Sequence, residues 1–362
     1  MSTTLDKIPA DLRWFAENAE SLDISNQHAS EVVTQLAAQG FLKIGVAESL
    51  GGSGGPLSAA VEAIERVATQ SVTAAFAFWG HRSFIEYVIL SPNEVLRSRL
   101  LPQLLNGELA GASGLSNAIK FLSGIEQLQI QAEKKSGDSW RVDGILPWVT
   151  NLRTEGFTVA AVVARTSGEP PLVVALRSDQ IGVERTDDLE LLGLRGSNTA
   201  AVHLRDVDVQ RDDLLHDNAQ LYIPRIRPSF LAFQCGLSLG LASASLQAAE
   251  QNSQRVSVNV LRGRIDAAAE ALQVQRSELL EGLDSGRFLH EPHAIFEVRI
   301  ALADTVRRAL ELELESSGGR AYLSQYNRDF SRRWRESAFI PLVTPSLVQL
   351  QGELLKRKQQ GL

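Results

Sequence analysis

The sequence is poor in the sulfur-containing residues that crosslink a chain or bind soft metals. Its 362 residues include one cysteine and one methionine. A single thiol, Cys235, forms no intramolecular disulfide and supplies no multi-cysteine metal site. Because Cys235 lies in an apolar run, we expect a buried and inert thiol in a reducing compartment.

The chain also lacks a concentrated positive charge and a long apolar run. Its 36 Lys and Arg against 43 Asp and Glu give a formal net charge of -7, which argues against a nucleic-acid groove. No run reaches the roughly 20 apolar residues of a membrane span, and the first residues do not form a basic and then apolar leader. The pair in His290-Glu-Pro-His293 lacks metal-binding spacing. We therefore expect a cytoplasmic protein with no nucleic acid, membrane or metal partner.

What is present divides the chain into three parts. Helical spacing of apolar residues predicts an N-terminal helical domain over 1–108 and a C-terminal four-helix bundle over 219–362. Between them, 109–218 holds short β-rich runs without intervening helices, which favours an antiparallel barrel or sandwich. The predicted class is α+β, mainly α. The expected strands are 128–132, 140–142, 157–164, 172–176 and 201–209, and the expected long helices of the bundle are 229–250, 258–283 and 292–316.

Four segments, in this order, resemble the acyl-CoA dehydrogenase superfamily. They are a helix and Gly-rich loop at 36–54, the passage 101–117, the strand at 142–151 that ends in W-V-T-N, and the stretch 192–209 that begins L-G-L-R-G-S-N-T. The resemblance covers most of the chain and implies the same three-part fold that the apolar periodicity predicts.

The resemblance also implies an FAD between the β-domain and the bundle, partly bound by a neighbouring subunit. On that basis Trp148 packs against the isoalloxazine ring and Thr150 bonds near its N5 atom, while Leu115 and Ser116 face the pyrimidine. A Trp-x-Thr strand places both side chains on one face, and an apolar wall with a donor suits hydride acceptance. The alternative is a core tryptophan beside an ordinary strand threonine.

Residues for the rest of the dinucleotide are implied less directly. Gly318 and Gly319 match a glycine pair that approaches the partner's FAD in the family, although Gly-Gly could equally end a helix. The family's pyrophosphate-binding arginine motif is not recognisable. Arg255, Arg262 and Arg264 are the candidates in its place.

The catalytic base of the family is missing from its usual place. Where the family carries a Y-E-G-T motif, this chain reads 340–347 as I-P-L-V-T-P-S-L, so Val343 or Thr344 stands in for the glutamate. The first helix of the bundle, where some members carry the base, has no acid in 229–236. The loop that usually meets the acyl-CoA is also replaced, by residues 116–124.

Three functions follow as hypotheses. The family default is oxidation of an acyl-CoA-like substrate by hydride transfer to flavin N5, with an electron-transfer flavoprotein as partner. The second is a two-component monooxygenase that uses O2 and reduced flavin, FAD or FMN, supplied by a flavin reductase; it needs a dry cavity and a hydrogen-bond donor near the flavin, for which His81 is the candidate. The third is a degenerate, non-catalytic flavoprotein subunit. In each case we expect a homodimer or homotetramer.

Overall fold

The computed structural model describes residues 8–122, 124–254, 260–323 and 328–359. Its N-terminal part is a set of packed helices that precede the first strand. The central helix of this set, α5, is buried at nearly every position from Val72 to Val88, and the Ser71 hydroxyl caps it by accepting the N–H of Ala74. The helices are α2 (Arg13–Ile24), α3 (Glu31–Ala38), α4 (Ser58–Ala68), α5 (Val72–Leu90) and α6 (Glu94–Leu105).

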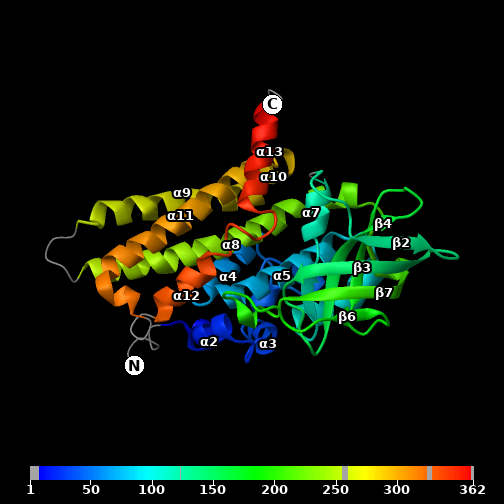
Figure 1. Cartoon of the computed structure of the whole chain (residues 1–362), viewed down its shortest axis with the longest axis horizontal. Coiled ribbons are helices and arrows are strands. Elements are labelled where there is room, and N and C mark those ends of the chain that lie inside the picture. Colours follow the sequence, from blue (N-terminus) through cyan, green and yellow to red (C-terminus); the bar gives the residue numbers. More distant parts are fainter. Residues whose placement is uncertain (1–7, 123, 255–259, 324–327, 360–362) are drawn as a thin grey trace.

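The middle of the chain folds into a mixed sheet that lies to one side of the helices in Figure 1. The strand order is β6-β7-β3-β2-β4-β5-β8, and β1 pairs with β4 beside that path. Pairs β1–β4 and β2–β4 are parallel, and the others are antiparallel. The strands are β1 (Ala110–Ser113), β2 (Ile130–Lys134), β3 (Ser139–Val149), β4 (Phe157–Arg165), β5 (Leu172–Arg177), β6 (Val183–Arg185), β7 (Ala200–Gln210) and β8 (Leu214–His216).

The C-terminal part is built on three long helices that run side by side in Figure 1. The most apolar, α8, passes by length and composition for a membrane span, but 89% of its most hydrophobic window is buried inside the protein. A projecting helix, α13, ends the described chain (Figure 1). The helices are α8 (Ala219–Ser253), α9 (Arg262–Asp284), α10 (Arg287–His290), α11 (Ala294–Ser317), α12 (Arg328–Ser337) and α13 (Leu347–Gln359).

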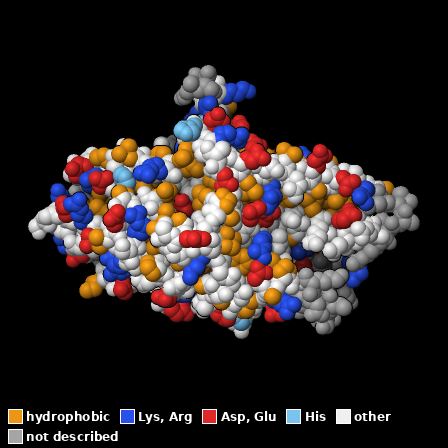
Figure 2. All heavy atoms as spheres, turned by 180° about the vertical axis from the view of Figure 1, so that it is seen from behind, with side chains coloured by type: hydrophobic (Ala, Val, Ile, Leu, Met, Phe, Trp, Pro, Cys, Tyr) orange, Lys and Arg blue, Asp and Glu red, His pale blue; other side chains and the backbone are white. Residues whose placement is uncertain are grey.

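Helix α5 joins the three parts because it packs against α4, α8 and β1. The close approach to β1 depends on Gly111: a Cβ there would lie 2.8 Å from the Cβ of Phe84. One buried apolar cluster consequently runs through all three segments. On the face seen in Figure 2, acidic and basic side chains are interspersed rather than separated.

The predicted fold class is confirmed, with corrections in detail. All five expected strands overlap observed ones, and the changes from helix to strand and back fall near 108 and 218. The expectation of an antiparallel β-domain was wrong in that the sheet is mixed. Strands β1 and β2 both pair with β4 in parallel, and the short helix α7 (Ser116–Leu122) lies between β1 and β2. Helix α8 also begins ten positions earlier than expected.

Candidate active site

A cleft of about 560 Å³ lies where the sheet meets the helices. This volume falls within the roughly 300–1,000 Å³ range of small-molecule sites. The β-side lining includes Ser113, Ser116, Lys120, Trp148, Thr150, Leu191–Leu194 and Thr199, and the helical side includes Phe76, Trp79, Phe230, Arg335, Phe339, Val343, Thr344 and Gln349.

A β-bulge aims Trp148 into this cleft. Leu146 pairs with Val202 and Val149 with Ala200, so β3 holds one extra residue over that interval. The indole of Trp148 is left 60% exposed, and it lines the cleft beside Thr150. An exposed tryptophan at the mouth of a cleft is a surface prepared for a planar ligand.

Behind Trp148, three hydroxyl groups form a chain. The Thr150 and Thr199 Oγ1 atoms lie 2.8 Å apart, and Ser197 Oγ lies 2.7 Å from Thr199 Oγ1. Thr150 and Thr199 both line the cleft. Because each hydroxyl both donates and accepts, the chain can orient its last proton toward a ligand.

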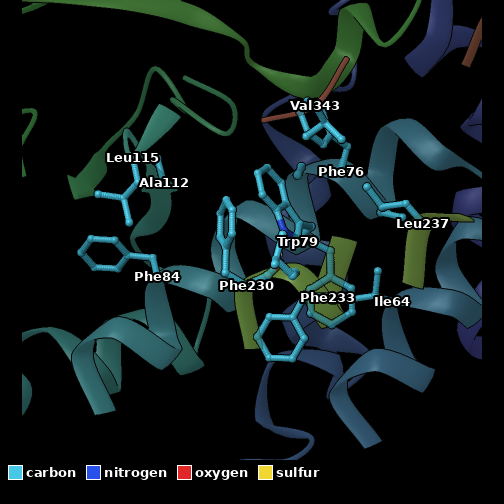
Figure 3. Packing of buried hydrophobic residues seen from close by; sticks show 14 of the residues in the cluster. Ile64, Phe76, Trp79, Phe84, Ala112, Leu115, Phe230, Phe233, Leu237 and Val343 are labelled. Carbon is cyan, nitrogen blue, oxygen red and sulfur yellow. Dashed lines mark hydrogen bonds between the residues drawn. The ribbon is translucent and has the colours of Figure 1, made fainter. Parts of the chain in front are cut away.

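The helical wall is aromatic and closed. The rings of Phe76 and Trp79 stack at 5.3 Å, Trp79 contacts Phe230 at 5.1 Å, and Phe76 contacts Phe339 at 4.6 Å. Figure 3 shows Trp79 between Phe230 and Phe76, with Val343 above them. The Trp79 indole N–H donates to the carbonyl of Phe230, so this wall offers apolar surface and no free donor from Trp79.

The segment 343–345 closes the cleft from the C-terminal side. Buried Arg299 of α11 donates to the carbonyls of Val343 and Pro345, and Gln234 of α8 donates to the carbonyl of Thr344 at 2.8 Å. Ser116 Oγ donates across the cleft to Thr344 Oγ1 at 2.9 Å. Within the part of the chain that the structure describes, no Asp or Glu lines the cleft.

The charged groups of the lining are both cations. Lys120 lies on α7, 3.5 Å from a carboxylate oxygen of Glu126. Arg335 on α12 is paired with the buried carboxylate of Asp23, whose other oxygen accepts the N–H of Leu194. Gly193 is required there, because a Cβ would lie 2.6 Å from that second oxygen. The Asp23–Arg335 pair thus fixes the loop that carries Leu191–Leu194.

Known proteins share sequence features with this chain. A family model described as "Acyl-CoA dehydrogenase, N-terminal domain" matches residues 13–108. Probable acyl-CoA dehydrogenase YngJ of Bacillus subtilis is 25% identical over 336 residues, covering 86% of this chain and 85% of its own. Mitochondrial isovaleryl-CoA dehydrogenase of Pongo abelii is 28% identical over 218 residues, 58% of this chain and about half (51%) of its own length. The chain belongs to the acyl-CoA dehydrogenase superfamily.

Solved structures of the same fold include members with different chemistry. A glutaryl-coenzyme A dehydrogenase in complex with glutaryl-CoA superposes with a TM-score of 0.84 at 18% identity, over 100% of this chain and 96% of that one. Dibenzothiophene monooxygenase from Paenibacillus sp. A11-2 gives 0.77 at 20% identity, over 99% and 97%. Likeness at this level shows the fold and leaves the reaction to the residues of the cleft.

The prediction that His81 donates a hydrogen bond in the cleft was wrong. The ring is fully buried; Nδ1 accepts the N–H of Gly111 at 3.0 Å, and Nε2 lies 2.9 Å from the carbonyl of Leu104. With Nδ1 as acceptor, the single proton of the neutral ring is on Nε2 and is used by Leu104. Burial lowers the pKa of His81 to about 4. His81 is therefore a structural link between α5, α6 and β1.

Of the other predicted residues, the structure brings Ser116, Trp148 and Thr150 into the cleft. Leu115 is buried beside it, with its carbonyl accepting the N–H of Ile119. Gly318 and Gly319 are exposed at the end of α11, outside the cleft lining, and nothing lies within 4 Å of a Cβ built on either. The glycine pair ends a helix in this chain, and its predicted contact with a partner's cofactor stays a prediction.

The arginine candidates do not converge on the cleft. Arg255 lies outside the described residues. Arg262 pairs with Asp266, and Arg264 pairs with Glu315 on the surface. Among the described residues, the one arginine that lines the cleft is Arg335, which is paired with Asp23, and neither Arg262 nor Arg264 lies there.

Sequence reasoning missed Arg299 and Gln234. Arg299 lies in no motif, and Gln234 lies in the segment 229–236, which is notable only for having no acid. Each donates to backbone carbonyls of a segment more than 40 residues away. An arginine in the apolar face of a predicted helix was the only signal, because a buried guanidinium must find acceptors. The thiol of Cys235 is buried as expected, and burial raises its pKa to about 12.

Proposed function

We propose that this protein is a flavin-dependent oxidoreductase whose ring-binding site is the cleft beside Trp148. The observation that carries the proposal is the exposed indole, turned by a bulge into a cleft of about 560 Å³ beside a chain of hydroxyls. A planar ring with one apolar and one polar edge fits that lining. The flavin supplies two-electron chemistry at its central ring, and the protein supplies position and dryness.

The residues that line the cleft would contribute to flavin binding in two ways. Trp148 would cover one side of the ring, while the hydroxyls of Ser116, Thr150 and Thr344 would meet its polar edge. Phe76, Trp79 and Phe230 exclude water from the opposite wall, which strengthens each hydrogen bond made inside.

The reaction that fits best is oxygen-dependent. Oxidation of an acyl thioester by the family's route needs a carboxylate to remove the α-proton, and none lines the described cleft. A monooxygenase that receives reduced flavin from a separate reductase needs no such base. Dibenzothiophene monooxygenase, which shares the fold, supports this choice. We propose a two-component monooxygenase acting on a small molecule, as a homo-oligomer.

Dehydrogenation is the second candidate, because the relatives by sequence carry dehydrogenase names. It would use an acyl-CoA and pass electrons to an electron-transfer flavoprotein. In this chain it requires a base other than a lining carboxylate. His81 serves neither candidate function, because both ring nitrogens are engaged.

Two measurements on the purified protein separate these functions. The first is the visible spectrum after loading with FAD or FMN, followed by anaerobic addition of acyl-CoAs of increasing chain length. The second is oxygen uptake with a flavin reductase, NADH and a panel of small molecules, corrected for uncoupled oxidation of free reduced flavin.

We expect flavin loading, no bleaching by any acyl-CoA, and oxygen uptake that depends on one class of substrate. Bleaching by an acyl-CoA would overturn the monooxygenase proposal in favour of dehydrogenation. A protein that loads neither flavin would overturn both and leave the non-catalytic subunit.

A further inference from the structure

Three consecutive carbonyl groups at the C-terminal wall of the cleft are each held by a buried side chain of the bundle. Arg299 donates through Nη2 to Val343 O at 2.9 Å and through Nη1 to Pro345 O. Gln234 Nε2 donates to Thr344 O, which lies between those two carbonyls in sequence. Two helices, α8 and α11, therefore fix the backbone of one tripeptide.

Burying the Arg299 guanidinium costs free energy, which indicates that the position of the 343–345 backbone matters. Arg299 is 3% exposed, and among the described residues no carboxylate acts on its guanidinium. Burial lowers the pKa of Arg299 to about 10, which leaves the guanidinium charged at neutral pH. A buried, unpaired guanidinium is expensive unless its donors are well used. Here they are used on the segment that ends the cleft.

The tripeptide presents one functional group to the cleft, the hydroxyl of Thr344. Ser116 donates its only proton to Thr344 Oγ1, so Ser116 has none left for a ligand. The proton of Thr344 is still available, because among the residues that the structure describes no other acceptor meets Oγ1. Both side chains line the cleft. Thr344, and not Ser116, is therefore the hydroxyl that can donate a hydrogen bond to a ligand.

We propose that Thr344 donates a hydrogen bond to the polar edge of the bound flavin ring, and that Arg299 and Gln234 are positioning residues that hold it there. This inference rests on the proposed function to the extent that the cleft binds a flavin. It is independent of whether the enzyme is a monooxygenase or a dehydrogenase. The acceptor is a carbonyl oxygen or unprotonated nitrogen of the pyrimidine part of the ring, where isoalloxazine carries its acceptors.

The test compares Thr344→Val with Thr344→Ser, using oxidised FMN and FAD as probes. Valine keeps the shape and removes the donor, whereas serine keeps the donor. We expect Thr344→Val to weaken flavin binding about fivefold, the loss of about one neutral hydrogen bond. We also expect its bound flavin band to shift toward that of free flavin. Thr344→Ser should retain both the affinity and the spectrum. The readouts are flavin fluorescence quenching and visible absorption.

Two further variants test the positioning residues. Arg299→Lys keeps a charge but not the fork that bridges two carbonyls, and should reproduce the spectral shift of Thr344→Val. If Arg299→Lys does not fold, Gln234→Met tests the same point, with an expected loss of about twofold in affinity and a partial shift. Thr305→Val is the matched control, since it removes a buried hydroxyl of α11 that bonds Gln275 outside the cleft.

The outcomes distinguish the two proposals. Wild-type binding with a Thr344→Val variant unchanged in both affinity and spectrum would overturn this inference and leave the proposed function intact. So would equal losses in Thr344→Val and Thr344→Ser, because they would mark a packing effect. A wild-type protein that binds neither FMN nor FAD would overturn the proposed function and this inference with it.

Discussion

The two walls of the cleft differ in how far they match what the superfamily resemblance implies. The β-side keeps the exposed Trp148 and the hydroxyls of Thr150 and Thr199. The helical side has a packed aromatic surface, and it carries Val343 or Thr344 where the resemblance implies a glutamate. Residues that would hold a ring come from both walls, Trp148 on one and Thr344 on the other. A carboxylate that would move a proton lines neither wall among the described residues.

The largest effect should come from opening the aromatic wall. Phe230 is 5% exposed and contacts Trp79. Phe230→Ala should lower the free energy of unfolding by about 3–5 kcal/mol, through lost burial and a cavity. Trp79 keeps its hydrogen bond, since it reaches the backbone carbonyl of residue 230. Urea unfolding measures the loss. Flavin affinity should fall as well, because Phe230 helps to exclude water from the cleft, but by a smaller factor than in Trp148→Ala. A large loss of flavin affinity without a loss of stability would contradict this expectation.

The next largest effect is expected from the buried ring of His81, which lies outside the cleft lining. Because the pKa of His81 is about 4 in the folded protein and 6.5 ordinarily, the unfolded chain takes up this proton first as the pH falls. Stability is therefore lost progressively below about pH 6.5, and the loss levels off below about pH 4. At 1.36 kcal/mol per pKa unit the full contribution is about 3 kcal/mol.

His81→Gln isolates this contribution. A glutamine can accept the Gly111 N–H through its oxygen and donate to Leu104 through its nitrogen, without taking up a proton. In urea unfolding between pH 7 and pH 4, the variant should lose about 3 kcal/mol less than the wild type. Parallel losses would show that the ring is already protonated or solvated in the folded state. Flavin affinity should be the same in both proteins, because His81 lies outside the cleft.

Much of the fold was predictable because apolar periodicity is a local signal. The strand from 157 to 165 and the helices α9 and α11 follow their patterns closely. The parallel pairing of β1 with β4 was not predictable in this way, because four residues with the sequence A-G-A-S carry no periodicity. Their place is set by α5, which packs on Gly111.

The site was predictable where a motif and a cleft coincide, as at Trp148 and Thr150. It was not where contacts join distant segments. Arg299, Gln234 and Thr344 come together only after α8, α11 and the C-terminal segment pack. His81 shows the converse error: a histidine in a suggestive place in the sequence was mistaken for a donor, although two backbone groups already use its nitrogens.

The smallest effect on free energy, and the most direct on the β-side, is expected from Trp148→Ala. Stacking of a heteroaromatic ring on an aromatic side chain contributes about 1–3 kcal/mol, so flavin affinity should fall about 30-fold. Stability should change by less than about 0.5 kcal/mol, since the indole is 60% exposed. Trp140 on the same strand is 6% exposed and provides the control: Trp140→Ala should destabilise the fold by several kcal/mol, about as much as Phe230→Ala. Fluorescence titration and urea unfolding of both variants decide the matter. If Trp148→Ala bound flavin as the wild type does, the exposed indole would have a different occupant, and the β-side would lose its assignment.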